Sequence, residues 1–170
     1  MTGLLNRRAF YDEELPRRIS RLERSAQTAA MYYVDMDNLK RVNNVNGQQA
    51  GDEAILYLRD IMINFSRPGD LVARLGGNEF AIWLDGIDEQ TSVKRVQQLL
   101  AMSKEMISMS GDDDHPLGIS VGVAFFDPST GESLDNLLAR ADAVMYSVKK
   151  RSKGNFELAP APGTPLEPQG

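Results

Sequence analysis

The sequence predicts a single α/β (α+β) domain in which helices cover a central sheet. Short apolar runs typical of strands alternate along the chain with longer segments of helical periodicity. A hydrophobic fraction of 42% in 170 residues is sufficient for one well-packed core. The tail from Ala159 onward is rich in proline, which predicts disorder. We therefore expect a folded domain at residues 1–158 and a disordered tail at residues 159–170.

The first half of the chain predicts a helix, a strand and a second helix. Asn6 is suited to cap a helix with one apolar face, and Pro16 is expected to kink or break it. Residues 28–34 form an apolar run that predicts a buried strand, which ends abruptly at Asp35. Helical periodicity returns over residues 50–65, after a polar loop.

The second half opens with two short strand-like runs, residues 71–75 and 80–84. Residues 76–79 between them include two glycines and predict a tight hairpin turn. The remaining predicted elements are a helix at 89–109, a strand at 118–126 and a helix at 134–150.

The composition excludes several classes of function. A net charge of −5 argues against nucleic acid or a membrane surface as the main partner, because both require clustered Lys and Arg. The absence of cysteine excludes disulfides and thiolate metal sites. No segment approaches the roughly 18 consecutive apolar residues of a membrane helix. We expect a cytoplasmic domain with no membrane segment of its own, whatever anchor a longer protein carries.

Asp35 and Asp37 stand at the end of the most apolar predicted strand. In an extended chain both side chains point to one face, with Met36 opposite. Carboxylates at strand ends commonly hold Mg²⁺ beside substrate phosphates. The same two residues also fit a turn that caps the next helix, and by themselves they favour that simpler interpretation.

The polar residues that follow allow similar alternatives. Residues 38–40 open a predicted short helix whose backbone N–H groups could cradle phosphates. Asn43 and Asp52 pair an amide with a carboxylate, which complements the donors and acceptor on the edge of guanine. A polar loop before a helix explains the same spacing. Lysines near the end of the last helix fit either a polyphosphate clamp or a favourable interaction with the helix dipole.

The order of these segments resembles the signature of the GGDEF family of diguanylate cyclases over roughly residues 1–157. The opening MTGLLNRRAF is similar to the first family motif, with Met1 in place of the usual residue. The other matching segments are VDMDNLKRVNN at 34–44, GQQAGD at 47–52, RLGGNEF at 74–80, ISVGVA at 119–124 and ARAD at 139–142 with Tyr146 and Lys149.

The resemblance implies a fold similar to adenylyl cyclase catalytic domains, with a five-stranded sheet and a β-hairpin that carries the signature turn. Such domains face one another in pairs and join two GTP molecules into cyclic di-GMP with release of pyrophosphate. The implied ligands are therefore GTP, cyclic di-GMP and Mg²⁺. The implied partners are a second GGDEF domain, as in a homodimer, and an upstream sensor domain outside this sequence.

The resemblance also assigns roles to individual residues. Asp35, the Met36 carbonyl and position 78 would hold the metal, and Gly76, Gly77, Asn78 and Glu79 would form the catalytic turn. The substrate residues would be the main-chain amides of Asn38, Leu39 and Lys40 at the phosphates, Asn43 and Asp52 at guanine, and Lys149 and Lys153 at the terminal phosphate. Arg67 and Asp70 occupy the place of the R-x-x-D motif that binds cyclic di-GMP as an inhibitor, although they also fit a simple turn.

Asn78 is the main departure from the family pattern, which has Asp or Glu at this position. An amide oxygen can ligate a metal, but it carries no charge and cannot act as a base. The Mg²⁺ site should therefore be weakened unless Glu79 or Asp37 moves in. Smaller departures are Leu39 for phenylalanine, Asn44 for aspartate and Gln48 for histidine.

Three functions follow from this pattern. The first is a degenerate GGDEF domain that binds GTP, cyclic di-GMP or both, with impaired or lost cyclase activity. The second is an active diguanylate cyclase in which Glu79 or water replaces the missing ligand. The third is a dimerisation scaffold without nucleotide, against which the presence of Asp35, Asn43, Asp52 and Lys149 argues.

Overall fold

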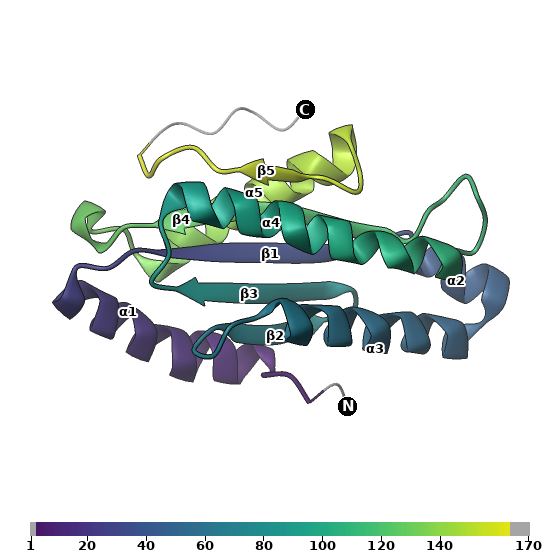
Figure 1. Ribbon diagram of the computed structural model, residues 1–170, viewed down its shortest axis with the longest axis horizontal. Helices are drawn as coiled ribbons and strands as arrows, with labels where there is room; N and C mark the ends of the chain where they lie inside the picture. Colours follow the sequence, from purple (N-terminus) through teal and green to yellow (C-terminus); the bar gives the residue numbers. More distant parts are fainter. Residues whose placement is uncertain (1–2, 164–170) are drawn as a thin grey trace.

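The computed structural model describes residues 3–163 and has a five-stranded sheet at its centre (Figure 1). The strands lie in the order β2-β3-β1-β4-β5; every neighbouring pair is antiparallel except β4 and β5. Their bounds are β1 Ala29–Asp37, β2 Leu71–Gly76, β3 Glu79–Asp85, β4 Gly118–Phe126 and β5 Phe156–Leu158. The sheet confirms the predicted α/β class and the five strands that the family resemblance implied.

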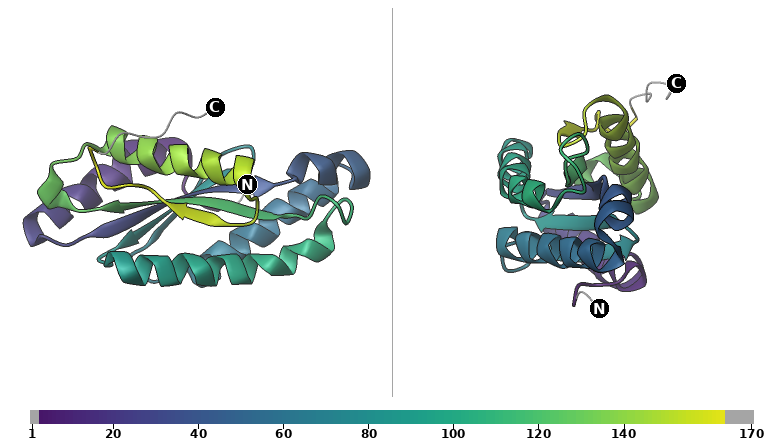
Figure 2. Two further views of the ribbon diagram at one scale, coloured as in Figure 1. Left: turned by 90° about the horizontal axis from the view of Figure 1, so that it is seen from above. Right: turned by 90° about the vertical axis from the view of Figure 1, so that its right-hand side faces the viewer.

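The helices form a layer on each face of the sheet (Figure 2). One layer contains α3 (Gln48–Phe65) and α4 (Glu89–Ser103), and the other contains α1 (Leu15–Ser25) and α5 (Leu134–Arg151). The remaining helical segments are η1 Ala9–Glu14, α2 Leu39–Asn46, η2 Lys104–Met109 and η3 Pro128–Thr130.

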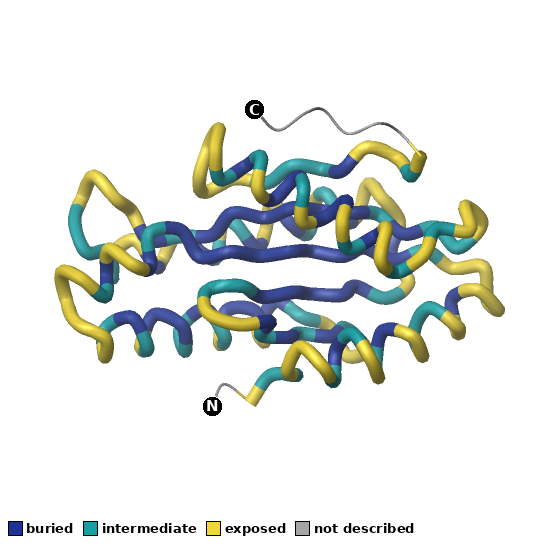
Figure 3. Tube along the Cα trace, turned by 180° about the vertical axis from the view of Figure 1, so that it is seen from behind, coloured by how far each residue is buried: buried dark blue, intermediate teal, exposed yellow. Residues whose placement is uncertain are grey.

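The central strand β1 is buried along its whole length, as the dark centre of Figure 3 shows. Its even-numbered side chains, such as Tyr32 and Val34, pack against the α3 and α4 layer. Its odd-numbered side chains, such as Met31 and Tyr33, pack against the α1 and α5 layer. A strand covered on both faces is apolar at nearly every position, which explains why its sequence reads as a continuous apolar run.

The structure tests several sequence predictions at the level of single residues. The Asn6 side chain accepts a hydrogen bond from the Ala9 amide at 2.7 Å, as a helix cap does. Pro16 lies in the first turn of α1, directly after the π-helical turn η1, where the helix changes type but continues without interruption from Arg7 to Ser25, so the predicted break does not occur. β1 runs three residues further than predicted, through Asp37, because Asp35 to Asp37 pair with β4.

The predicted boundary at residue 158 needs correction. Ala159 is only 8% exposed, and its amide donates to the Val123 carbonyl at 2.7 Å. The Pro160 carbonyl accepts from Arg140 at 2.9 Å. The packed part of the chain therefore includes residues that the proline content had assigned to the tail. Residues 164–170 of that predicted tail, and residues 1–2 of the opening motif, lie outside the described residues.

Helix α5 lies directly on β4, and this close contact positions its C-terminal lysines. A Cβ atom at Gly122 would lie 2.1 Å from the Ala141 carbonyl oxygen and 2.6 Å from the Met145 nitrogen. Both are backbone atoms, so only glycine allows this approach. Within residues 3–163, no helix is long and apolar enough to span a membrane.

Candidate functional site

Most of the predicted site residues gather at one end of the sheet, on the right of Figure 1. The end of β1, the β2–β3 hairpin turn, the start of α2 and the end of α5 meet there. Gly77 and Asn78 form the turn itself, between Gly76 and Glu79, which pair across the hairpin. Arg74 fixes this turn by donating from its Nη2 to the Gly77 carbonyl at 2.8 Å.

Asn78 and Lys149 contact the two oxygen atoms that the family resemblance assigns to the metal. The Asn78 Nδ2 donates to the Asp35 carboxylate and, at 3.1 Å, to the Met36 carbonyl. The Lys149 Nζ lies 3.0 Å from the same Asp35 oxygen and 3.1 Å from the Met36 carbonyl. Each of the two oxygens that the resemblance assigns to the metal thus accepts from two N–H donors within the chain.

The electrostatics of Asp35 reflect its position inside the fold. The residue is 7% exposed, and burial raises the pKa of its carboxyl above the ordinary value. The Lys149 ammonium opposes that shift through a hydrogen bond and its charge. Lys149 is therefore the principal counter-charge of Asp35, and its ammonium group contacts the same two oxygens that the resemblance assigns to a metal ion.

The two carboxylates that were considered as replacement ligands have other partners. Asp37 is 2% exposed and accepts hydrogen bonds from Ser120 Oγ at 2.6 Å and from the Gly154 amide at 2.9 Å. Glu79 accepts from the Tyr33 hydroxyl at 3.1 Å. The Asp37 side chain therefore links β1 by hydrogen bonds to β4 and to the segment that follows α5.

These residues do not fit a divalent cation in the arrangement that the structure shows. Mg²⁺ requires oxygen ligands in near-octahedral geometry, whereas an amide nitrogen and an ammonium point at the oxygens available here. Turning the Asn78 amide would bring its oxygen inward but would still leave one carboxylate, Asp35, among the assigned ligands. In the described part of the chain, no group of three or more His, Cys, Asp or Glu gathers as a metal site.

A pocket of about 330 Å³ lies beside the hairpin turn and brings the predicted guanine residues together. Its lining consists of Leu39, Lys40, Asn43, Gln48, Asp52, Ile55, Arg74, Gly77 and Asn78. The pocket joins α2 and α3 to the signature turn, so the residues predicted to bind guanine and the turn residues line the same space. Ile55 and Arg74 were not predicted as site residues, since an apolar helix position and a strand arginine carry no distinctive signal alone.

Asn43 has an acceptor that the fold leaves unused. Its Oδ1 is buried and has no hydrogen-bond partner among the described residues. A Cβ atom at Gly51 would lie 1.6 Å from this oxygen, so the glycine makes room for the amide. A buried acceptor without a partner costs about 1–3 kcal/mol, which a donor from a ligand would offset. Asp52 accepts from Gln48 at 3.1 Å and keeps further acceptor sites.

The start of α2 has the features of a phosphate loop. Asn38 precedes the helix with a left-handed φ of 65° and makes no side-chain cap, so the first-turn N–H groups keep their capacity to donate. Its side chain instead donates to the Pro116 carbonyl at 2.8 Å and accepts from Lys153 Nζ at 3.3 Å. Lys153 therefore lies beside the loop that the resemblance assigns to the phosphates.

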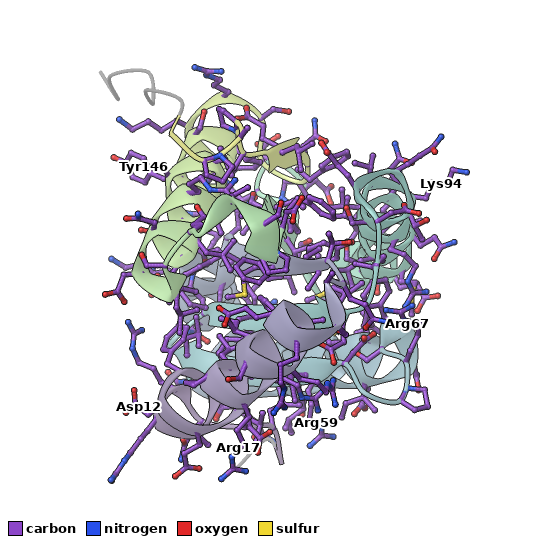
Figure 4. All side chains as sticks on the ribbon, turned by 90° about the vertical axis from the view of Figure 1, so that its left-hand side faces the viewer. Asp12, Arg17, Arg59, Arg67, Lys94 and Tyr146 are labelled. Atoms are coloured by element: carbon purple, nitrogen blue, oxygen red, sulfur yellow. The ribbon has the colours of Figure 1, made fainter. Side chains whose placement is uncertain are left out.

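The loop between α3 and β2, which contains Arg67 and Asp70, lies at the opposite end of the sheet (Figure 1). Arg67 Nη2 lies 3.3 Å from the Asp70 carboxylate and donates to the Asp85 carbonyl at 3.0 Å. The Asp85 carboxylate accepts from Arg18 at 2.9 Å and also from Arg21. Figure 4 shows Arg67 on the opposite side of the molecule from Tyr146 of α5.

This second cluster contains residues that sequence reasoning missed. Arg18 and Arg21 lie one turn apart on α1, and only folding brings them to Asp85 at the end of β3. Three arginines and two aspartates thus meet at one surface. Such a cluster offers bidentate donors for phosphate and carboxylate acceptors for a base edge.

Comparison with known proteins identifies the family of the chain. The family described as "Diguanylate cyclase, GGDEF domain" matches residues 1–155. The diguanylate cyclase DgcM of Escherichia coli is 34% identical over 159 residues, which cover 94% of this chain and 37% of that protein. The GGDEF domain of TpbB from Pseudomonas aeruginosa superposes with a TM-score of 0.84 at 29% identity, covering 95% of this chain and 99% of that one.

A third similar structure is the GGDEF domain of DgcB from Caulobacter crescentus in complex with c-di-GMP. It has a TM-score of 0.81 at 27% identity, covering 92% of this chain and 91% of that one. The fold, the order of motifs and these matches together show that the chain belongs to the GGDEF family of cyclic-di-GMP signalling. The chain spans little more than a third of the length of the curated relatives it matches.

Proposed function

We propose that this chain is a guanine-nucleotide-binding GGDEF domain whose diguanylate cyclase step is strongly impaired. The observation that carries the proposal is the contact of the Asn78 amide nitrogen with the Asp35 carboxylate and the Met36 carbonyl. A carboxylate at position 78 would repel these two oxygens and favour a bound cation between them. The Asn78 amide instead donates hydrogen bonds to both oxygens. The Mg²⁺ site that the family uses is therefore weakened here.

Loss of the charge at position 78 removes electrostatic stabilisation where phosphoryl transfer requires it. Deleting one such stabilising group in other enzymes costs roughly 10²–10³-fold in rate. Asn78 also lacks the basicity to accept a proton from an attacking hydroxyl. The neighbouring carboxylates give little compensation, since Asp37 and Glu79 have partners elsewhere.

Nucleotide binding is supported independently of catalysis. The unsatisfied Asn43 oxygen is matched to a guanine N–H donor, and Asp52 adds a carboxylate to the same pocket. Lys149 and Lys153 supply positive charge toward the phosphate loop. Phosphate contact needs only a suitably placed cation, so lysine at position 153 is adequate.

A second candidate function is reception of cyclic di-GMP at the Arg67 cluster. Arg67 and Asp70 pair with each other in the structure. A cyclic dinucleotide would replace this pair with a contact from Arg67 to its phosphate and a contact from Asp70 to its base edge. Arg18 and Arg21 add positive charge at the same surface, although both pair with Asp85 in the structure. The retained cluster favours a receptor that has lost the synthetic step.

The test is a pair of calorimetric titrations followed by product analysis. The purified chain is titrated with GTP plus Mg²⁺ and, separately, with cyclic di-GMP, and the GTP sample is then assayed for cyclic di-GMP. Asn43→Ala should abolish the GTP heat without changing that of cyclic di-GMP. Arg67→Ala should do the reverse.

Each outcome separates the three functions. Binding without product supports the proposal, and gain of turnover in Asn78→Asp shows that the rest of the site is competent. Clear turnover by the wild-type chain would make it an active cyclase with an unusual site. Binding of neither nucleotide would leave only a scaffold that acts as a homodimer or with a second GGDEF domain.

A further inference from the structure

A second pocket, with a volume of about 390 Å³, lies behind the phosphate loop. Its walls come from the end of α4, from η2, from the loop before β4 and from the start of β4. Only Asn38 and Lys153 belong both to this pocket and to the predicted phosphate site. Pockets that hold small molecules typically measure about 300–1,000 Å³, so this one is large enough for a small ligand.

The floor of this rear pocket is apolar. Leu117 and Ile119 contribute fully buried side chains, and Leu100 of α4 faces them across the space. Ile107 at its edge is 53% exposed and adds apolar surface to the rim. The pocket exists because β5 pairs only with Val121–Val123 and leaves the first residues of β4 without a neighbour on that side.

The polar groups around the pocket favour an anion. Lys104 and Lys153 are exposed and form no ion pair within the part of the chain that the structure describes. The Asp37 carboxylate in the wall accepts from Ser120 and Gly154 and has its counter-charge in Lys149 at 3.8 Å, and His115 pairs with Asp112 at 2.7 Å. One exposed carboxylate, Asp114, remains against two lysines that form no ion pair among the described residues, and one of these, Lys153, donates to Asn38.

We propose that the rear pocket binds a small molecule with an apolar body and one anionic group, and that this ligand acts on the phosphate loop. The link is Asn38, whose side chain donates to the Pro116 carbonyl in the pocket wall and accepts from Lys153. A bound anion draws Lys153 into the pocket and releases Asn38. The site therefore acts as an effector site, and the part of the inference that concerns nucleotide rests on the proposed GTP binding.

The sign of the coupling follows from the shared lysine. The single ammonium group of Lys153 cannot pair fully with two anions at once, one in the rear pocket and the other a terminal phosphate on the far side of Asn38. Occupation of the rear pocket should therefore weaken GTP binding, and GTP should weaken occupation by the same factor, because coupling between two sites is reciprocal. A factor of about 5 or more is typical of such coupling.

The probe is 1-anilinonaphthalene-8-sulfonate, which has an apolar aromatic body and a single sulfonate. Saturable binding of one probe per chain is followed by fluorescence. Ile107→Glu places a negative charge at the pocket edge without disturbing the core and should weaken binding about tenfold, or about 1.4 kcal/mol. Ile63→Glu is the matched control, because Ile63 is a 50% exposed isoleucine on α3 that does not line the pocket.

Equal probe affinity in the two glutamate variants, or no saturable binding by the wild-type chain, would overturn the proposal. Lys153→Met should weaken the probe and abolish its antagonism of GTP, whereas an unchanged antagonism would refute the role of Lys153. The probe titration does not involve nucleotide. A chain that binds the probe but not GTP would refute the proposed function and the coupling while keeping the pocket.

Discussion

The most informative perturbation is Asn78→Asp, because it reverses the charge relation at the end of β1. The Asn78 amide nitrogen donates to the Asp35 carboxylate and to the Met36 carbonyl. An aspartate would put an anionic oxygen against these two acceptors. The substitution therefore removes two hydrogen bonds and adds a repulsion between buried or half-buried oxygens.

The magnitude follows from the contacts. Two lost hydrogen bonds are worth about 1 kcal/mol each. Two carboxylates about 4 Å apart repel by roughly 4 kcal/mol at an effective dielectric of about 20, and Lys149, 3.0 Å from Asp35, offsets most of this. We expect the metal-free variant to be about 2–3 kcal/mol less stable than the wild-type chain.

Magnesium should reverse this loss in the variant alone. A ligand at 100 times its dissociation constant stabilises the folded state by about 2.7 kcal/mol when it does not bind the unfolded chain. Two carboxylates and the Met36 carbonyl would give the variant such a site. The wild-type chain, whose oxygens face N–H donors, should respond to Mg²⁺ by only a few tenths of a kcal/mol.

The assay is urea unfolding with EDTA and with excess MgCl₂, followed by the fluorescence of Trp83. Trp83 is the only tryptophan and is fully buried, so its emission reports global unfolding. Asn136→Asp is the control, since it makes the same chemical change at an exposed position in the first turn of α5. Its stability should not depend on Mg²⁺.

Two results would refute this reasoning. The first is a wild-type chain that Mg²⁺ stabilises as strongly as the variant, because the amide would then be an adequate metal ligand. The second is an Asn78→Asp variant with unchanged stability in EDTA. In that case the contact between Asn78 and Asp35 does not hold the site together as the structure indicates.

Three further predictions concern packing, the nucleotide pocket and pH. Gly122→Ala should destabilise the domain by about 1–3 kcal/mol in urea unfolding, since its Cβ meets the α5 backbone, whereas Gly118→Ala, with open space around it, should cost far less. Gly51→Ala should weaken GTP binding in calorimetry at least tenfold by displacing the Asn43 amide, with little change in cyclic-di-GMP binding. A hydrogen bond from the Thr91 amide in the first turn of α4 lowers the pKa of the Asp88 carboxyl below its ordinary value of 3.8. The charged carboxylate therefore stabilises the folded chain above pH 3.8, and this stabilisation is lost as the pH falls through the lowered pKa. Asp88→Asn keeps the cap but should lack this acid-dependent loss in urea unfolding.

Each of these three predictions has an outcome that contradicts it. Equal stability of Gly118→Ala and Gly122→Ala would mean that α5 is free to move off the sheet. Unchanged GTP affinity in Gly51→Ala would remove Asn43 from nucleotide recognition. Parallel loss of stability on acidification in the wild-type chain and in Asp88→Asn would show that other carboxylates account for it.

Much of the fold was predictable because its determinants are local. The strand at 118–126 and the helix at 134–150 appeared within one residue of their predicted bounds, since hydrophobic period alone distinguishes them. β5 was missed, because a three-residue strand acquires its structure only by pairing with β4. The early end assigned to the domain failed for a similar reason, because Ala159 is held by a contact with Val123, far away in the sequence.

The candidate site divides in the same way. The sequence by itself predicted the family, the motifs that line the pocket and a departure from the family pattern at Asn78, because these are properties of residue type and order. Only the tertiary structure decided that the Asn78 amide faces Asp35, that Asp37 and Glu79 have other partners, and that Arg18 and Arg21 join Arg67. Hydrogen bonds and ion pairs between distant segments depend on where the sheet places the ends of its strands, and residue order does not specify that geometry.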